Sequence, residues 1–310
     1  MKKLLFITMV AAIIGLGIFV VSNISQKSKT SSQKINVVTT LFPLYDFAKV
    51  IGQDKVEVSL LLPPGVEAHS FEPKPSDIVK INESDIFVYT GKFMEPWAED
   101  IINGVTNKDV KFVNTSNGIN LMKLTEGMPD EAHGLDPHIW LDFDNNKIMI
   151  DSIAKALTEK DPANAGFYQK NAAEYKDKLV QLDNQYKSSL AKCENKEIVY
   201  GGHYAFGYLA SRYNLKYLAA QGLAPDSEPT ASDLIKLVEQ VKKDDIKYVF
   251  YEEMTTPKIA ETIANETKAK LLLLNAAHNV TKEDIEANVS FLSIMKENLI
   301  NLKTGLGCSE

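Results

Sequence analysis

The feature that most constrains the fold is a long stretch of helical periodicity in the middle of the chain. No proline occurs in residues 163–192, and apolar side chains recur there every three or four positions. The apolar positions are Tyr168, Ala172, Tyr175, Leu179, Leu182, Tyr186 and Leu190. This spacing predicts a single helix, about 45 Å long at 1.5 Å per residue. A helix of that length runs the full height of two small domains, so we expect it to join two lobes.

On both sides of this segment the pattern alternates between strands and helices. Strands are predicted at residues 35–40, 56–62, 86–89, 111–113, 198–200, 216–219, 247–251 and 270–274. Helices are predicted at residues 45–51, 76–82 (capped by Ser76), 145–160, 205–213, 231–242, 257–267 and 282–303. Such alternation is typical of parallel sheets covered by helices. The predicted fold class is α/β, with two Rossmann-like lobes at residues 35–143 and 193–310 and a linking helical segment at 144–192.

The first 34 residues have the pattern of a targeting segment followed by a tether. Lys2 and Lys3 precede an apolar run, residues 4–21, that contains no charge. This pattern predicts either a signal peptide or an uncleaved membrane anchor, because the run is close to the lower limit for spanning a bilayer. Residues 22–34 are rich in Ser, Lys and Gln, as in flexible tethers. In both cases we expect the rest of the chain to work outside the cytoplasm, in the periplasmic space or at the cell surface, secreted or anchored to the outer face of the cytoplasmic membrane.

The net charge and the cysteine content indicate which partners and which bonds to expect. The formal net charge is −7, which argues against nucleic acid as a partner because phosphate binding requires a basic face. Cys193 and Cys308 are the only cysteines. In an oxidising compartment such a pair predicts one disulfide, and two free thiols remain the alternative.

Four of the five histidines lie just beyond predicted strands or in the loops that flank them: His69, His138, His203 and His278. The carboxyl ends of parallel strands open onto the binding crevice of an α/β sheet, so histidines from both lobes are expected to converge there. Imidazole suits Zn²⁺, and three or four ring nitrogens make a tetrahedral site. The fifth histidine, His133, either passes metal inward or is a solvated loop residue.

These histidines lie in runs that resemble a known family. The runs are TTLFP at residues 39–43, PGVEAHSFEP at 64–73, DPHIWLD at 136–142, HYAFGYL at 203–209 and MKENL at 295–299. They are similar to the metal-binding substrate-binding proteins of ABC transporters, of the zinc and manganese type. The resemblance covers nearly everything after the tether. It implies the cluster A-I solute-binding fold and a receptor that captures Zn²⁺ between two lobes.

The resemblance implies His69, His138 and His203 as metal ligands, and this chain departs from the family at the fourth. Members commonly place Asp or Glu in the loop after the last strand, which here reads NAAHN at residues 275–279. His278 is the expected replacement as fourth ligand, and Glu253 is the reserve candidate. A water molecule in the fourth position remains a further alternative. Asp136 flanks His138 and is expected to orient its ring. Asp142, on the other side, is expected to do the same, to cap a helix or to face solvent.

The predicted function follows from this ligand set. Manganese prefers oxygen donors, and manganese-type members carry Glu where this chain has His203, so Zn²⁺ is expected, with Mn²⁺ or Fe²⁺ as the alternative. The implied partners are an ABC permease and its separate ATPase, since this chain has no phosphate-binding P-loop run, and we expect a monomer. A surface adhesion protein is one rival. A zinc hydrolase that uses Glu253 as its base is the other rival function. The sequence does not contain the H-E-x-x-H run that such enzymes often have.

Overall fold

The computed structural model describes residues 34–124, 134–223, 229–254 and 256–309. The predicted signal or anchor segment and His133 lie outside these residues. Residues from Ile35 onward form one compact unit. In the described part of the chain, none of the helices combines the length and apolar character needed to cross a bilayer.

The first sheet is entirely parallel. Its strands are β1 (Ile35–Thr39), β2 (Val56–Leu60), β3 (Ile86–Tyr89) and β4 (Lys111–Asn114). They lie in the order β2-β1-β3-β4, with Val37 opposite both Val58 and Ile86. Every residue of β3 is buried, as expected for a central strand covered on both faces.

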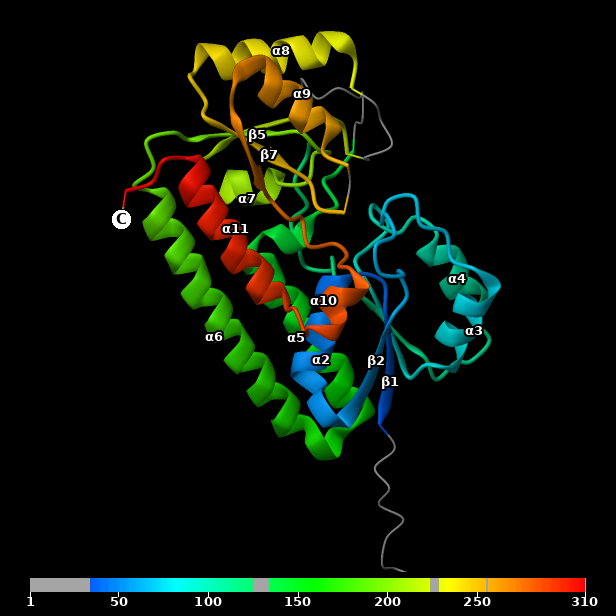
Figure 1. Cartoon of the computed structure of the whole chain (residues 1–310). Helices are drawn as coiled ribbons and strands as arrows, with labels where there is room; N and C mark the ends of the chain where they lie inside the picture. Colours follow the sequence, from blue (N-terminus) through cyan, green and yellow to red (C-terminus); the bar gives the residue numbers. More distant parts are fainter. Residues whose placement is uncertain (1–33, 125–133, 224–228, 255, 310) are drawn as a thin grey trace, which may run out of the picture. The chain divides into compact units, whose positions relative to one another are not determined.

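The second sheet repeats this topology. Its strands are β5 (Glu197–Tyr200), β6 (Lys216–Ala219), β7 (Tyr248–Tyr251) and β8 (Lys270–Leu273). They are parallel and lie in the order β6-β5-β7-β8. Two parallel α/β lobes joined by a long helix confirm the predicted fold class (Figure 1).

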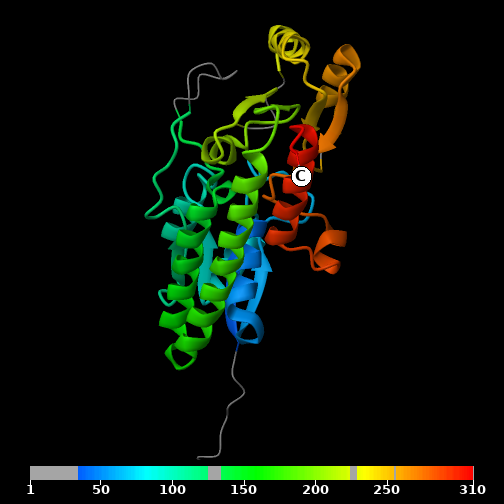
Figure 2. The same ribbon diagram turned by 90° about the vertical axis from the view of Figure 1, so that its left-hand side faces the viewer.

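The helices fall into outer covers and a central group. The outer helices are α3 (Pro75–Glu83), α4 (Ala98–Gly104), α8 (Ala231–Lys243) and α9 (Lys258–Thr267). The remaining helices are α2 (Phe42–Gly52), α5 (Phe143–Lys160), α6 (Ala165–Leu190), α7 (Gly207–Arg212), α10 (Lys282–Glu286) and α11 (Phe291–Gly305). The described residues also form three 3₁₀ turns, η1 (Gln53–Lys55), η2 (Ile139–Leu141) and η3 (Pro162–Asn164). In Figures 1 and 2, α6 runs beside α5 and α11 along the unit.

Helix α6 is the predicted linking helix. Its 26 residues correspond to about 39 Å. All seven apolar positions named from the sequence are buried. Two of them also bind elements from either end of the chain: the Tyr175 hydroxyl donates to Asp46 Oδ2 on α2 at 2.8 Å, and the Tyr186 hydroxyl donates to the Met295 carbonyl on α11 at 2.6 Å.

One apolar core is shared by the two lobes. It contains buried residues of α2, α5, α6, α7 and α11, while smaller cores lie beneath α3 and α4 and beneath α8 and α9. A continuous core resists separation of its two sides, because opening it exposes apolar surface to water. The fold therefore favours small movements between the lobes.

Several helix boundaries differ from the sequence predictions, and two of these differences have a clear physical reason. Residues 282–303 form two helices, α10 and α11, rather than one. Asn288 between them has φ of 55°, and Ser290 caps α11 by accepting a hydrogen bond from the Ser293 amide. Helix α3 begins at Pro75, not after Ser76, because proline suits the first helical turn, where no amide donor is needed.

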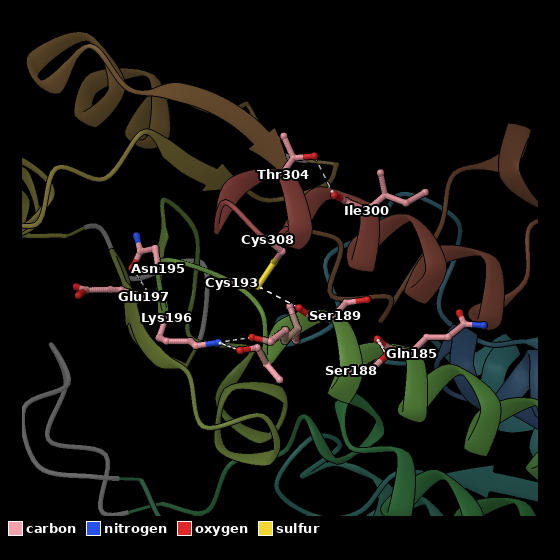
Figure 3. The surroundings of a disulfide bond; sticks show 12 residues. Gln185, Ser188, Ser189, Cys193, Asn195, Lys196, Glu197, Ile300, Thr304 and Cys308 are labelled. Atoms are coloured by element: carbon pink, nitrogen blue, oxygen red, sulfur yellow. Dashed lines mark hydrogen bonds between the residues drawn. A yellow bond between two sulfur atoms is a disulfide. The ribbon is translucent and has the colours of Figure 1, made fainter. Parts of the chain in front are cut away.

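The two cysteines are bonded to each other in the structure. Cys193 follows α6 and Cys308 follows α11, 115 residues later in the chain (Figure 3). Backbone hydrogen bonds run alongside the bond, from the Glu194 amide to the Gly307 carbonyl and from the Asn195 amide to the Leu306 carbonyl. The bond thus ties the ends of two helices that pack against each other.

Replacing both cysteines by serine is expected to lower the free energy of unfolding by about 2–4 kcal/mol, because a long loop is no longer closed in the unfolded chain. Urea denaturation of the metal-free protein measures this loss. The wild type in reductant is the matched control and should show the same loss. A double variant as stable as the oxidised wild type would contradict a stabilising disulfide.

Candidate metal centre

Four histidines reach one place from loops that follow the strands. His69 lies between β2 and α3, and His138 comes directly before η2. His203 lies between β5 and α7, and His278 between β8 and α10. Two come from each lobe, as the position of the strand ends predicts.

The rings pack closely enough to share one ion. His138 Nε2 lies 3.2 Å from His69 Nε2 and 3.2 Å from His203 Nε2. The ring centre of His278 lies 5.4 Å from that of His203 and 6.1 Å from that of His69. Three histidines therefore form a tight group, and His278 lies at its edge.

The loops that carry these rings are hydrogen-bonded across the lobes. The side-chain amide of Asn279 donates to the carbonyls of Pro63 and Val66, both at 2.8 Å. Trp140 Nε1 donates to the Ala276 carbonyl at 2.7 Å. The loop with His278 is thus fixed to the loops with His69 and His138, and the relative positions of the rings follow from these bonds.

Asp136 sets the orientation of His138. Its Oδ1 lies 2.8 Å from His138 Nδ1 and also accepts the His138 amide at 2.9 Å. Burial raises the pKa of Asp136 to about 8. The second oxygen, Oδ2, is buried without a hydrogen-bond partner. When Asp136 is ionised, its Oδ1 can only accept, and His138 Nδ1 then carries the proton.

Glu252 does the same for His203. Its Oε1 lies 2.7 Å from His203 Nδ1, and its Oε2 accepts the His203 amide at 3.2 Å. Burial alone would raise the pKa of Glu252, but the hydrogen bonds with His203 and the charges of His203 and His278 together outweigh it and lower the pKa. Glu252 is therefore an anionic acceptor, and His203 Nδ1 carries the proton.

Two lone pairs consequently face each other at the centre of the site. With both Nδ1 atoms protonated, His138 Nε2 and His203 Nε2 are both acceptors, yet they lie 3.2 Å apart. Two ligands of a tetrahedral Zn²⁺ at about 2.0–2.1 Å lie about 3.3 Å apart. A cation between these nitrogens resolves the repulsion, so the donor set and its spacing fit a divalent metal.

The free rings also resist protonation. Burial, and then the neighbouring histidines, holds the pKa of His69 and of His138 well below the usual range. Both rings are therefore neutral at neutral pH and keep a lone pair for a metal.

His278 has a different environment. Its Nδ1 lies 3.3 Å from Glu253 Oε1, although neither atom has a hydrogen bond of good geometry. Burial alone would lower the pKa of His278, but Glu253 and then Glu252 and Glu67 outweigh it and raise the pKa. Glu253 Oε2 accepts the Ala276 amide at 3.0 Å. Glu253 thus lies behind His278, where it can hold the ring and balance positive charge.

Comparison with known proteins decides the family. Residues 37–305 match the family described as zinc-uptake complex component A, periplasmic. The chain belongs to this family. It is 38% identical over 297 residues to the high-affinity zinc uptake system protein ZnuA of Bacillus subtilis, with 92% of each chain covered.

Two further proteins are similar to this chain. The zinc-binding lipoprotein AdcA of Streptococcus pneumoniae is 35% identical; the match covers 89% of this chain but only 56% of AdcA. The solved laminin-binding protein Lmb of Streptococcus agalactiae, described as a bifunctional adhesin and metal transporter, is 31% identical with a TM-score of 0.80. That match covers 88% of this chain and all of Lmb.

Three carboxylates show where reasoning from the family's motifs was incomplete. Of the three roles left open for Asp142, the structure shows the helix cap: it accepts the Asp144 amide at 2.7 Å and the Asn145 amide at 3.2 Å. Glu252 and Glu67 were not predicted to act at the site. Glu252 directly follows β7, so its position in the sequence already indicated that it lies at the carboxyl edge of the sheet, near the site.

Proposed function

We propose that this chain is an extracytoplasmic receptor that captures Zn²⁺ between its two lobes and delivers it to an ABC importer. The observation that carries this proposal is the 3.2 Å approach of His138 Nε2 and His203 Nε2, contributed by different lobes, with a carboxylate oxygen behind each ring at Nδ1. Membership of the zinc-uptake family supports the same cargo.

His69, His138 and His203 are the first three ligands in this proposal, and His278 is the fourth. The two 3.2 Å contacts between Nε2 atoms match two edges of a zinc tetrahedron. His278 stands farther out and closes onto the ion with a small shift. Glu253, the reserve candidate, acts behind His278 instead of binding the metal.

An all-nitrogen ligand set favours zinc over manganese. Imidazole suits Zn²⁺, whereas Mn²⁺ is commonly bound through carboxylate and carbonyl oxygens. Two carboxylates beside the site, Asp136 and Glu252, are turned toward Nδ1 atoms and held there by hydrogen bonds. They balance charge and fix ring orientation, which raises the basicity of the ligands.

The same contacts favour binding over catalysis. A hydrolase requires an open metal position and a base within reach of the bound water. Glu253 uses Oε2 for the Ala276 amide and turns Oε1 toward His278, which leaves it poorly placed as that base. In the proposed cycle the protein therefore captures and releases the ion without chemical change. It acts as a monomer, together with a membrane permease and a separate ATPase.

Adhesion on the same scaffold stays an alternative prediction. Lmb has this fold and is described as both adhesin and metal transporter. A shared fold does not distinguish these activities, because function resides in sites and surfaces carried by the fold.

The proposal is tested by metal competition with a His278→Ala variant. Metal-free wild type offered equal Zn²⁺ and Mn²⁺ is expected to retain one equivalent of zinc. The variant is expected to bind zinc about tenfold to a hundredfold more weakly, since a peripheral ligand is lost while three inner nitrogens remain. Elemental analysis gives the stoichiometry, and a chelator of known affinity gives the Kd.

Different outcomes would reject different parts of the proposal. Manganese retained in preference to zinc would reject the cargo. An unchanged Kd in the variant would reject His278 as fourth ligand and leave the position to water. Absence of any stoichiometric metal in the wild type would reject the receptor function itself.

A further inference from the structure

One carboxylate at the site has no assigned role. Glu67 lies in the loop after β2, two residues before His69. Its Oε2 accepts hydrogen bonds from the Ser70 amide at 2.8 Å and the Ser70 hydroxyl at 3.1 Å. Its Oε1 is buried and has no hydrogen-bond partner.

Glu67 belongs to a second donor group beside the central one. One of its oxygens lies within 4.8 Å of a ring nitrogen of His69 and of His278. In the central group, the ring nitrogens of His69, His138 and His203 also lie within 4.8 Å of one another. The two groups share His69, so an ion can move from one to the other without losing that ligand.

Two members of the group with Glu67 are more exposed than the inner rings. His138 and His203 are fully buried and His278 is nearly so, whereas Glu67 and His69 are partly exposed. An ion from solvent therefore meets Glu67 and His69 before it meets the inner rings. A carboxylate at this point attracts a dication and is a hard oxygen donor for a hydrated ion.

We propose that Glu67, His69 and His278 form an outer binding position that receives Zn²⁺ first. This inference rests on the proposed zinc function. In the next step, bonds to His138 Nε2 and His203 Nε2 form while the bond to the Glu67 oxygen breaks. The two hydrogen bonds from Ser70 keep the carboxylate at the rim, so Glu67 does not follow the ion inward. Release uses the same position in reverse.

Glu67→Gln is the decisive variant. Glutamine keeps an oxygen to accept the Ser70 bonds but removes the anionic donor. We expect association and dissociation of Zn²⁺ each to slow by about tenfold, in the range by which local charge alters association rates. The Kd should change little, since an intermediate position lowers the barrier in both directions.

Trp140 provides the signal. Its ring centre lies 5.4 Å from that of His138, and its ring stacks on His278 at 6.3 Å, so its fluorescence should respond to an ion at the site. Stopped-flow mixing of the purified protein with Zn²⁺ gives the association rate, and a chelator chase gives the dissociation rate.

Glu72→Gln is the matched control, because it removes one exposed negative charge from the same loop. It should change both rates by less than about twofold, as expected for a screened surface charge. Equal rates in the two variants would overturn the inference. Faster release with a weaker Kd in Glu67→Gln would also overturn it, by making Glu67 a permanent ligand. Failure of the wild type to bind zinc at equilibrium would instead reject the proposed function.

Discussion

Replacing His203 by alanine is expected to weaken Zn²⁺ binding by roughly a hundredfold or more. Protein zinc sites with four ligands bind with about 10–16 kcal/mol, so one inner ligand accounts for about 3 kcal/mol. His203 is fully buried, which leaves water little access to take its place. Chelator competition at fixed pH measures the change in Kd.

Two further variants serve as comparisons for the change in Kd caused by His203→Ala. Glu252→Gln keeps an acceptor for His203 Nδ1 but removes the charge, and it should weaken binding by about 10–100-fold. His133→Ala repeats the histidine-to-alanine change at the remaining histidine and should leave the Kd unchanged. A His203→Ala protein that keeps its secondary structure and binds zinc as tightly as wild type would contradict the proposed ligand set.

Replacing Arg212 by alanine is expected to lower the free energy of unfolding by about 3 kcal/mol, the lower end for breaking a buried ion pair. Arg212 lies at the end of α7, and its guanidinium binds both oxygens of Asp183 on α6, at 2.8 and 2.7 Å. It also binds Asp142 at 3.0 Å, at the start of α5. Alanine would leave the buried Asp183 without its main cation.

The loss should depend on pH in a defined direction. Burial alone would raise the pKa of Asp183, but hydrogen bonds from Arg212, Lys187 and Tyr213 outweigh it and hold the pKa well below the usual range. Since the unfolded pKa is about 3.9, this contribution is fully present above about pH 4 and is lost as pH falls further. The stability difference between wild type and variant should be constant from pH 7 to 5 and narrow below about pH 4.

Lys187→Ala is the matched control for Arg212→Ala. Lys187 also binds Asp183, at 2.7 Å, but its side chain is 53% exposed. Its loss should change stability by at most about 1 kcal/mol, as for surface ion pairs. Urea unfolding of the metal-free proteins makes the comparison. Equal losses in the two variants, or a difference that persists into acid, would contradict the role given to Arg212.

The chain's local patterns determined the architecture. The proline-free run with seven apolar positions predicted α6, because helical periodicity places those side chains on one face whatever the face contacts. Strand positions followed from short apolar runs bounded by turns. The break between α10 and α11 was missed, because no glycine or proline interrupts residues 282–303 and the turn at Asn288 depends on an uncommon backbone conformation.

The sequence also placed four histidines near the ends of strands, since in parallel α/β sheets these ends share one edge. Which groups stand behind the rings depended on tertiary structure. Asp136 and Asp142 are both close to His138 in sequence, yet only Asp136 turns toward its ring, while Asp142 caps α5 and binds Arg212. Glu252 and Glu253 are consecutive, yet they face different histidines. Sequence spacing limits which loops meet, but the direction of each side chain is decided by packing and hydrogen bonds between segments far apart in the chain.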